Sequence, residues 1–144
     1  MSNTNEYGVS DWENDISLAQ AANIDAFALN IAVNDTTNGA SLAYAFAAAN
    51  NLGSTFKLFF SFDYAANGLW PQDDVISFLQ TYTPNDAYYY RGSQPFVSTF
   101  EGEADASDWT AIKAATNCFV VPSWSSLSSV AAWALGTADG LFSW

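Results

Sequence analysis

The sequence predicts an α/β fold in which strands and helices alternate as part of a (β/α)8 TIM-type barrel. Short apolar runs typical of buried strands alternate with segments of helical spacing along the 144 residues. These runs are nearly continuous, which is typical of parallel strands covered on both faces. About five parallel strands are expected, whereas a closed eight-stranded barrel needs about 250 residues. The chain is therefore either an open α/β sheet or part of a barrel. Its end inside an apolar strand, at Trp144, favours the second, so we expect residues 1–144 to form one partial barrel domain.

The composition fits one globular unit and disfavours several partners. Half of the residues are hydrophobic and 17% are aromatic, which is enough for a sizeable core. The chain has 15 acidic and 3 basic residues, so its net charge is −12. Nucleic acids and anionic membranes are poor partners for so acidic a protein. No apolar run is long enough to cross a bilayer.

The residue types exclude several kinds of catalysis. The chain has no His and one Cys, so neither an ordinary zinc site nor a Ser-His-Asp triad can be built. No glycine-rich phosphate loop is present. Cys118 lies in an apolar run, and we expect it to be a buried and unreactive thiol. Acidic residues such as Asp35, Asp63, Glu101 and Glu103 could gather a hard cation, but their spacing matches no calcium loop.

The N-terminal part predicts a helix followed by a strand. Ser10 and Glu13 have the spacing of a capping box, and the apolar residues behind them have helical spacing over Asp11 to Ala22. Asp25 to Ile31 is typical of a buried strand, with Asn30 near its C-terminal end. A polar loop follows.

The next two elements centre on the longest apolar strand. Ala40 to Asn51 is rich in Ala and Leu, which favours a helix, and Gly53 favours its end. The run Leu58 to Phe60 then begins a buried strand that delivers Asp63 and Tyr64 to its C-terminal end. In α/β folds the functional groups lie at that end of the strands.

The following segment predicts a helix and an irregular connection. Trp70 ends the loop after the central strand. Pro71 and the acids at positions 73 and 74 favour a helix start, and the helix should extend to about Tyr82. Pro84 ends it, and residues 88–92 are expected to be an irregular connection.

The C-terminal part predicts two more strands, two more helices and a final strand. The expected elements are a strand over Phe96 to Glu101, a helix from Asp105 or Ser107 to Ala115, a strand over Cys118 to Val121, a helix over Ser126 to Leu135 and a strand over Leu141 to Trp144. Glu101, Gly102 and Glu103 stand where the first of these strands ends. Carboxylates therefore follow two neighbouring strands.

Five separated motifs, in order, resemble one family of glycosidases. They are DAFALN (25–30), KLFFSFDY (57–64), VSTFEG (97–102), VPSWSS (121–126) and DGLFSW (139–144), preceded by SDWENDISLAQAANI. Together they resemble glycoside hydrolase family 71, the fungal endo-α-1,3-glucanases or mutanases. The resemblance implies a (β/α)8 catalytic barrel that hydrolyses α-1,3-glucan of fungal walls or bacterial mutan with inversion, without metal or cofactor.

The chain departs from the family pattern at both ends. The family opens with a strand bearing a V-G-N-like stretch, of which residues 1–4 keep at most a remnant. It continues beyond Trp144 with a W-N-D-Y-G-E-like segment, whose D-x-x-E pair is a strong candidate for the acid and base. Two functions are therefore open: hydrolysis of α-1,3-glucan, or binding of α-glucan by a noncatalytic fragment.

The carboxylates at the strand ends are the catalytic candidates. Glycoside hydrolysis needs one protonated and one ionised carboxyl group, which inverting enzymes hold about 6.5 to 9.5 Å apart. Asp63 and Glu101 form the best pair, with Glu103 as the substitute for Glu101. The alternative for Asp63 is ligand positioning or loop capping, and the alternative for Glu101 is substrate binding. Glu103 is alternatively a loop residue that binds backbone N–H groups.

Aromatic and polar residues near the same strand ends are the substrate-binding candidates. Sugar rings present apolar faces that pack on flat aromatic rings. Trp70, Trp124 and Trp144 each follow or end a predicted strand, and each is either a platform for glucose rings or a core residue. Asn30 and Tyr64 are candidate contacts to sugar hydroxyls.

The resemblance also bears on partners and location. The partner implied is a polysaccharide, α-1,3-glucan, and the location implied is outside the cell or in the cell wall. The start of the chain, MSNTNEYG, has neither region of a signal peptide, so a cytoplasmic location stays open. The open edges of an incomplete sheet could join copies of the chain into a homo-oligomer.

Overall fold

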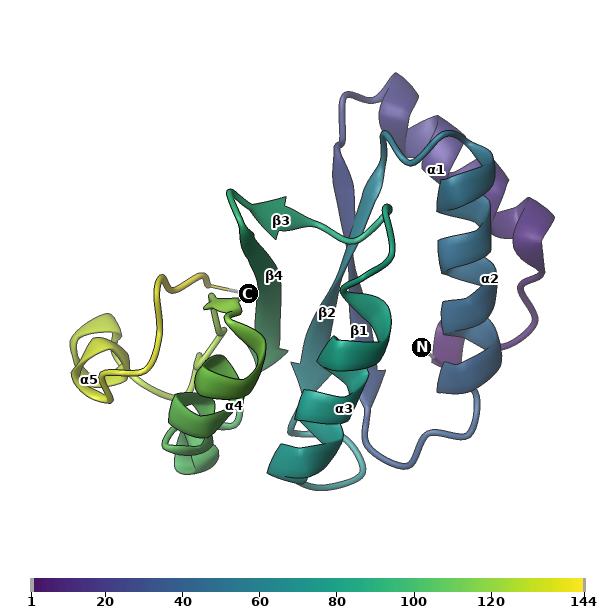
Figure 1. Cartoon of the computed structure of the whole chain (residues 1–144). Coiled ribbons are helices and arrows are strands. Elements are labelled where there is room, and N and C mark those ends of the chain that lie inside the picture. Colours follow the sequence, from purple (N-terminus) through teal and green to yellow (C-terminus); the bar gives the residue numbers. More distant parts are fainter. Residues whose placement is uncertain (1, 144) are drawn as a thin grey trace.

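The computed structural model describes residues 2–143 and confirms an α/β fold in which helices alternate with strands (Figure 1). The strands are β1 (Ala26–Ala32), β2 (Lys57–Asp63), β3 (Tyr90–Arg91), β4 (Gln94–Phe100) and β5 (Phe119–Val120). The helices are α1 (Val9–Ala21), α2 (Asn38–Asn51), α3 (Gln72–Tyr82), α4 (Asp108–Thr116) and α5 (Ser129–Ala134), with 3-10 turns η1 (Ser2–Thr4) and η2 (Glu103–Asp105).

The five strands form one open sheet, as expected for part of a barrel. Strands β1, β2, β4 and β5 are parallel neighbours in that order. Strand β3 is the fifth, and it pairs antiparallel with β4 through a tight hairpin. The predicted irregular connection at 88–92 is therefore partly a strand, because its Tyr-rich sequence pairs with the start of β4. The sheet does not close among the described residues.

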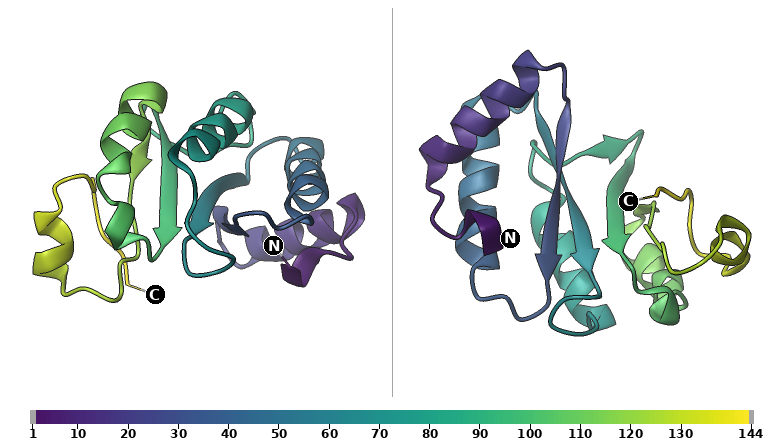
Figure 2. Two further views of the ribbon diagram at one scale, coloured as in Figure 1. Left: turned by 90° about the horizontal axis from the view of Figure 1, so that it is seen from below. Right: turned by 180° about the vertical axis from the view of Figure 1, so that it is seen from behind.

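One face of the sheet carries the main core. Leu58, Phe60 and Phe62 alternate along β2 and are fully buried on the side of the helices. Phe60 packs edge-on against Phe78 and Tyr82 of α3, with ring centroids 6.0 and 5.2 Å apart. Figure 2 shows the helices arranged around the outside of the curved sheet. The continuous apolar run at 58–60 is thus explained by burial on this side and partial burial on the other.

The opposite face of the sheet is more open and also aromatic. Phe59, Phe96 and Phe119 come from three neighbouring strands and are only half-buried. Phe96 contacts Phe59 edge-on and stacks on Phe119, at centroid distances of 4.8 and 6.1 Å. The guanidinium of Arg91 lies 4.3 Å from the Phe119 ring. In a closed barrel this would be the inner face.

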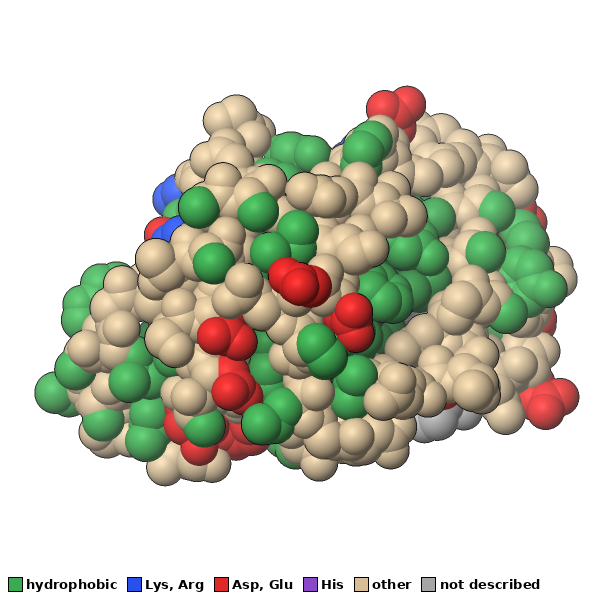
Figure 3. All heavy atoms as spheres, turned by 60° about the horizontal axis from the view of Figure 1, so that its bottom comes forward, with side chains coloured by type: hydrophobic (Ala, Val, Ile, Leu, Met, Phe, Trp, Pro, Cys, Tyr) green, Lys and Arg blue, Asp and Glu red, His purple; other side chains and the backbone are tan. Residues whose placement is uncertain are grey.

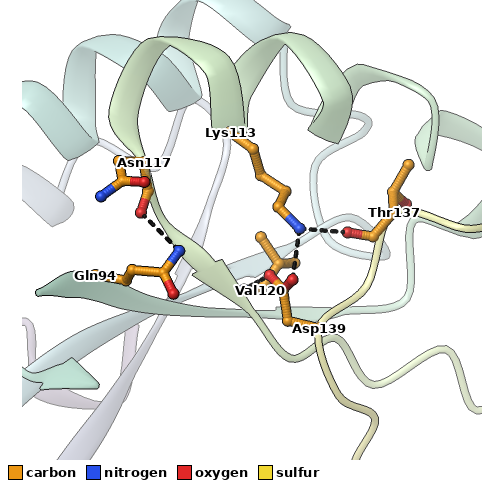
Figure 4. Close-up of polar contacts among 6 residues, drawn as sticks. All are labelled: Gln94, Lys113, Asn117, Val120, Thr137 and Asp139. Carbon is orange, nitrogen blue, oxygen red and sulfur yellow. Dashed lines mark hydrogen bonds and ion pairs between the residues drawn. The ribbon is translucent and has the colours of Figure 1, made fainter. Parts of the chain in front are cut away.

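The predicted strand at 141–144 does not form as a regular strand in its described part. Residues 139–142 nevertheless run beside β5: Asp139 N donates to Val120 O at 2.8 Å and Phe142 N donates to Pro122 O at 3.3 Å. The Asp139 carboxylate accepts from Val120 N at 2.9 Å and from Lys113 Nζ at 2.7 Å (Figure 4). An ion pair to α4 therefore holds this segment against the sheet.

Helix boundaries follow the predictions with a few corrections. The start of α3 is confirmed, with Pro71 as its N-cap and two acids in its first turn. The capping prediction for α1 is wrong: the helix begins at Val9, and Gly8 N donates to the Asp11 carboxylate at 2.8 Å. Helix α5 starts later than predicted, where the Ser128 hydroxyl accepts from Ala131 N. Several serine and aspartate residues near each helix start are N-caps of similar strength, so the sequence does not determine which of them begins the helix.

Two further predictions concern single features. Cys118 is fully buried, which confirms the expected position of the thiol, and burial raises its pKa. Of the helices among residues 2–143, none has the length and apolar character of a membrane span.

Candidate active site

The C-terminal ends of β1, β2 and β4 meet at one edge of the sheet. Across the ladder Asp63 stands next to Ala32 on one side and next to Phe100 on the other. Glu101 follows Phe100 directly, so the two predicted carboxylates come from neighbouring strand ends. Seen from the side of the strand ends, acidic side chains gather on this surface among hydrophobic ones (Figure 3).

Asp63 is held in one orientation by three hydrogen bonds. Its Oδ1 accepts from the backbone N–H groups of Ala65 and Ala66, each at 2.9 Å. Its Oδ2 accepts from Asn30 Nδ2, also at 2.9 Å. Asn30 lies on β1, so two strands and the loop after β2 fix this carboxyl group, which stays partly exposed.

The backbone of Glu101 is fixed in an uncommon conformation. Its φ is 53°, in the left-handed region that residues other than glycine rarely adopt. Its N–H donates to Ser123 O at 2.9 Å, and its carbonyl accepts from the Thr99 hydroxyl at 2.8 Å. Such backbone conformations persist where the surroundings determine them, and they are concentrated at functional sites.

The side chain of Glu101 is bound by the loop after β5. Its Oε1 accepts from the Ser125 hydroxyl, and its Oε2 accepts from the hydroxyl and the N–H of Ser126 at 3.0 and 3.3 Å. The hydrogen bond from Ser125, followed by those from Ser126, lowers the pKa of Glu101. The carboxyl group is therefore ionised at neutral and mildly acidic pH.

Glu103 lies apart from these contacts, in the turn η2, where it is half-buried. The pKa of Asp105 is raised. Burial is the largest cause, and the negative charges of Asp108 and Glu103 add to it. One Asp105 oxygen, Oδ2, is buried without a hydrogen-bond partner among the described residues. The sequence indicated Asp105 only as a possible start of the following helix. Its unusual environment could not be predicted, because it arises where η2 lies beside Tyr64 of the loop after β2.

The aromatic candidates are more buried than binding platforms usually are. The Trp70 indole is 4% exposed and packs edge-on against Phe62 and Phe78, and Trp124 is 3% exposed. Their burial favours the core alternative for both. Trp144 lies outside the described residues.

Tyr64 is also buried, 5% exposed, and burial together with the charges of Asp105 and Asp108 raises its pKa. Its ring lies against Gly102, whose φ is +92°. A Cβ at Gly102 would lie 2.5 Å from Tyr64 Cγ. The glycine after Glu101 thus permits both the turn and the close packing of the ring.

Substituting Gly102 by alanine should therefore destabilise the fold strongly. Gly53 is a matched control, because its φ is +87° and nothing lies within 4 Å of its Cβ position. Gly53→Ala should lower the free energy of unfolding by about 1 kcal/mol, the cost of a left-handed alanine. Gly102→Ala should add a clash and cost about 1 to 3 kcal/mol more. Urea unfolding of both variants measures the difference; equal losses would show that the ring is not tightly packed.

Two site residues were missed by the sequence reasoning. Ser125 and Ser126 appear in the VPSWSS motif, but no role was assigned to them. The contact between these serines and Glu101 could not be predicted from their separation along the chain, because it joins two loops that follow neighbouring strands. Among residues 2–143, no group of three or more acidic, Cys or His side chains is arranged to hold a metal ion.

An α/β sheet with carboxylates at the C-terminal ends of its strands is a scaffold and site typical of glycosidases. The profile of glycosyl hydrolase family 71 matches residues 1–144. The chain belongs to glycosyl hydrolase family 71.

The similar relatives are fungal proteins. The chain is 38% identical to a glucan endo-1,3-alpha-glucosidase of Schizosaccharomyces pombe, over all of this chain and 36% of the relative. It is 33% identical to a mutanase of Penicillium rubens, over 96% of this chain and 31% of the relative. An ascus wall endo-1,3-alpha-glucanase of S. pombe is 27% identical over the whole chain and 36% of the relative. The chain therefore spans about a third of the length of these relatives.

Proposed function

We propose that this protein hydrolyses α-1,3-glucosidic bonds in glucan, by an inverting mechanism that uses two carboxyl groups. The observation that carries the proposal is the pair Asp63 and Glu101 at adjacent strand ends, each held by three hydrogen bonds. Membership of family 71 and the activities by which the relatives are named support the substrate class.

The lowered pKa of Glu101 suits it to be the base of this reaction. In the proposed step, water attacks the anomeric carbon and gives a proton to Glu101, while the bond to the leaving oxygen breaks. Asp63 gives its proton to that oxygen. Glu103, which follows Glu101 in the turn η2, is the substitute for Glu101 in this role.

The substrate contacts are proposed from the same edge of the sheet. Asn30 lies beside Asp63 and can also bind a glucose hydroxyl through its amide group. Tyr64 is proposed to bind through its hydroxyl. Trp144 is the remaining candidate for an aromatic platform, while the buried Trp70 and Trp124 would support the site by packing beneath it.

The alternative is that the chain binds α-glucan without cleaving it. The observation in its favour is that the chain spans about a third of its relatives' length. Release of reducing sugar from α-1,3-glucan, measured beside a pull-down on the insoluble polymer, separates the two functions. Release supports hydrolysis, and binding without release rejects it in favour of the binding function. A β-1,3-glucan tested in parallel controls for the linkage.

We also propose that the 144-residue chain forms homo-oligomers. Within the described residues β1 has a strand partner on one side only, and the face with Phe59, Phe96 and Phe119 is half-exposed. Light scattering after size exclusion should give a mass above 15.6 kDa that rises with concentration. The monomer mass at every concentration would contradict this.

The place of action is proposed from the substrate. One relative is named as an ascus wall endo-1,3-alpha-glucanase, and the resemblance to family 71 implies that the substrate is the α-1,3-glucan of fungal walls. We therefore propose that the protein acts at a fungal cell wall or outside the cell.

A further inference from the structure

We propose that a cavity between the loop after β5, helix α5 and residues 141–143 binds one glucose unit of an α-glucan. The cavity lies beyond β5, at the end of the sheet away from β1 (Figure 1). The inference rests on the substrate class proposed above and deepens it by adding a sugar position. It does not depend on which carboxyl groups are the acid and the base.

The size of the cavity suits a single sugar ring. Its volume is about 320 Å³, and it is partly open to solvent. Ligand pockets in proteins range from about 300 to 1,000 Å³. A cavity at the lower end of that range accepts a small ring rather than a length of polymer.

The lining combines an apolar wall with hydroxyl groups. Trp124 and Leu141 form the wall together with Phe142, which is 36% exposed. The hydroxyl groups belong to Ser125, Ser129 and Ser143. No described residue that lines the cavity is charged. A sugar ring has an apolar face that packs on aromatic rings and hydroxyls around its edge, so it uses both parts of this lining.

The three serine hydroxyls have hydrogen-bonding capacity left for a ligand. Ser129 and Ser143 make no side-chain hydrogen bond with the described residues. Ser125 donates to Glu101 Oε1, and its oxygen can still accept. A sugar hydroxyl both donates and accepts, so it can pair with each of the three. This capacity matches a neutral ligand that carries several hydroxyls.

Backbone hydrogen bonds hold the walls of the cavity in place. Leu127 N donates to Trp124 O at 3.1 Å in the loop after β5. Phe142 N donates to Pro122 O at 3.3 Å, which ties the opposite wall to the same loop. The cavity is therefore formed before a ligand binds, and binding needs little ordering of the chain.

Ser125 connects the cavity to the acidic edge of the sheet. Its side chain lines the cavity and donates to the Glu101 carboxylate. A glucose unit in the cavity would therefore lie beside Glu101. A glucan chain that continues from this unit toward Glu101 meets the C-terminal ends of β4 and β2, where Asp63 stands.

An apolar side chain from a second copy of the chain is the alternative occupant. It would cover Leu141 and Phe142 but would leave the serine hydroxyls of the lining without partners. Covering polar groups without pairing them costs free energy. The composition of the lining therefore favours a sugar over an apolar side chain.

The test is an NMR titration with the α-1,3-linked trisaccharide of glucose. The methyl signals of Ala132 and Leu141, which line the cavity, should shift and saturate. Sorbitol has hydroxyls but no ring face, so it should leave these signals in place. Absent shifts with the trisaccharide, or equal shifts with sorbitol, would overturn the inference. Signals that move on dilution without sugar and ignore the trisaccharide would identify a second copy as the occupant and overturn it too.

Substitutions locate the binding position. Phe142→Ala should weaken binding of the trisaccharide about tenfold, and Ser129→Ala should weaken it about 2- to 10-fold. Trp133→Ala is the matched control, because Trp133 is 58% exposed on α5 but does not line the cavity. Equal losses in Trp133→Ala and Phe142→Ala would place the sugar elsewhere on α5 and overturn the inference. If Phe142→Ala does not fold, Ser129→Leu, which narrows the cavity from an exposed position, is judged by the same criterion.

The outcome can be separated from that of the glucan assay. Binding of the trisaccharide in the cavity, without release of sugar from the polymer, would reject hydrolysis and support the inference. Release of sugar from the polymer, with no response of the cavity signals, would support hydrolysis and overturn the inference.

Discussion

Asp63→Asn should lower the turnover of α-1,3-glucan by about 100- to 10,000-fold, the usual contribution of a general acid or base. The variant should keep its fold, because the asparagine oxygen can still accept from the N–H groups of Ala65 and Ala66. The Asn30 amide can turn to present its oxygen to the new amide group. The loss would therefore report the missing proton rather than a missing structure.

Initial rates on insoluble α-1,3-glucan measure this effect, and the polymer pull-down shows whether binding persists. Asp73→Asn is the matched control, because Asp73 is exposed in the first turn of α3. The control should turn over glucan at the wild-type rate. A near-normal rate in Asp63→Asn would remove Asp63 from the mechanism.

Glu101→Gln should lower turnover by a similar factor, about 100- to 10,000-fold. The glutamine oxygen can accept from one serine and its amide can donate to the other hydroxyl, so the loop after β5 should stay in place. In the proposed mechanism, the substitution removes the group that accepts the proton of water. We expect the ionisation of Glu101 to produce the acidic limb of the wild-type pH profile, and this limb should disappear in the variant.

The same variant has a consequence for stability. Because the folded-state pKa of Glu101 is lowered, its contacts stabilise the fold above the unfolded-state pKa and are lost as the pH falls through the folded value. Unfolding of Glu101→Gln should therefore depend less on acidic pH. Glu6→Gln, at an exposed position, is the control for both measurements. Unaltered turnover in Glu101→Gln would exclude Glu101 as the base and leave Glu103 to be tested.

The strands and helices were predictable where local pattern and burial agree. The run at 58–60 is apolar because one side of β2 meets the helices and the other meets neighbouring aromatic rings. Strand β3 could not be predicted, because two residues carry no period and exist as a strand only through pairing with β4. The prediction of a strand over Leu141 to Trp144 was wrong in its described part for a similar reason. Residues 139–142 are held by contacts with β5 and α4, among them the ion pair between Asp139 and Lys113.

Some features of the candidate site could likewise be predicted from the sequence, and others could not. Asp63 and Glu101 could be placed at one edge because parallel strands align their carboxyl ends, and that rule needs only strand order. The serine pair, the left-handed backbone of Glu101 and the packing of Tyr64 on Gly102 could not be derived. Each depends on how two loops approach one another.

Residue order along the chain was thus sufficient for the alternating elements, the family and the two carboxylates, because these follow from local periodicity and short motifs. The burial of Trp70 and Trp124, and the donors that surround each carboxyl group, were settled by packing. The physical reason is that hydrogen bonds and desolvation depend on distances between segments remote in the chain, which no local pattern encodes.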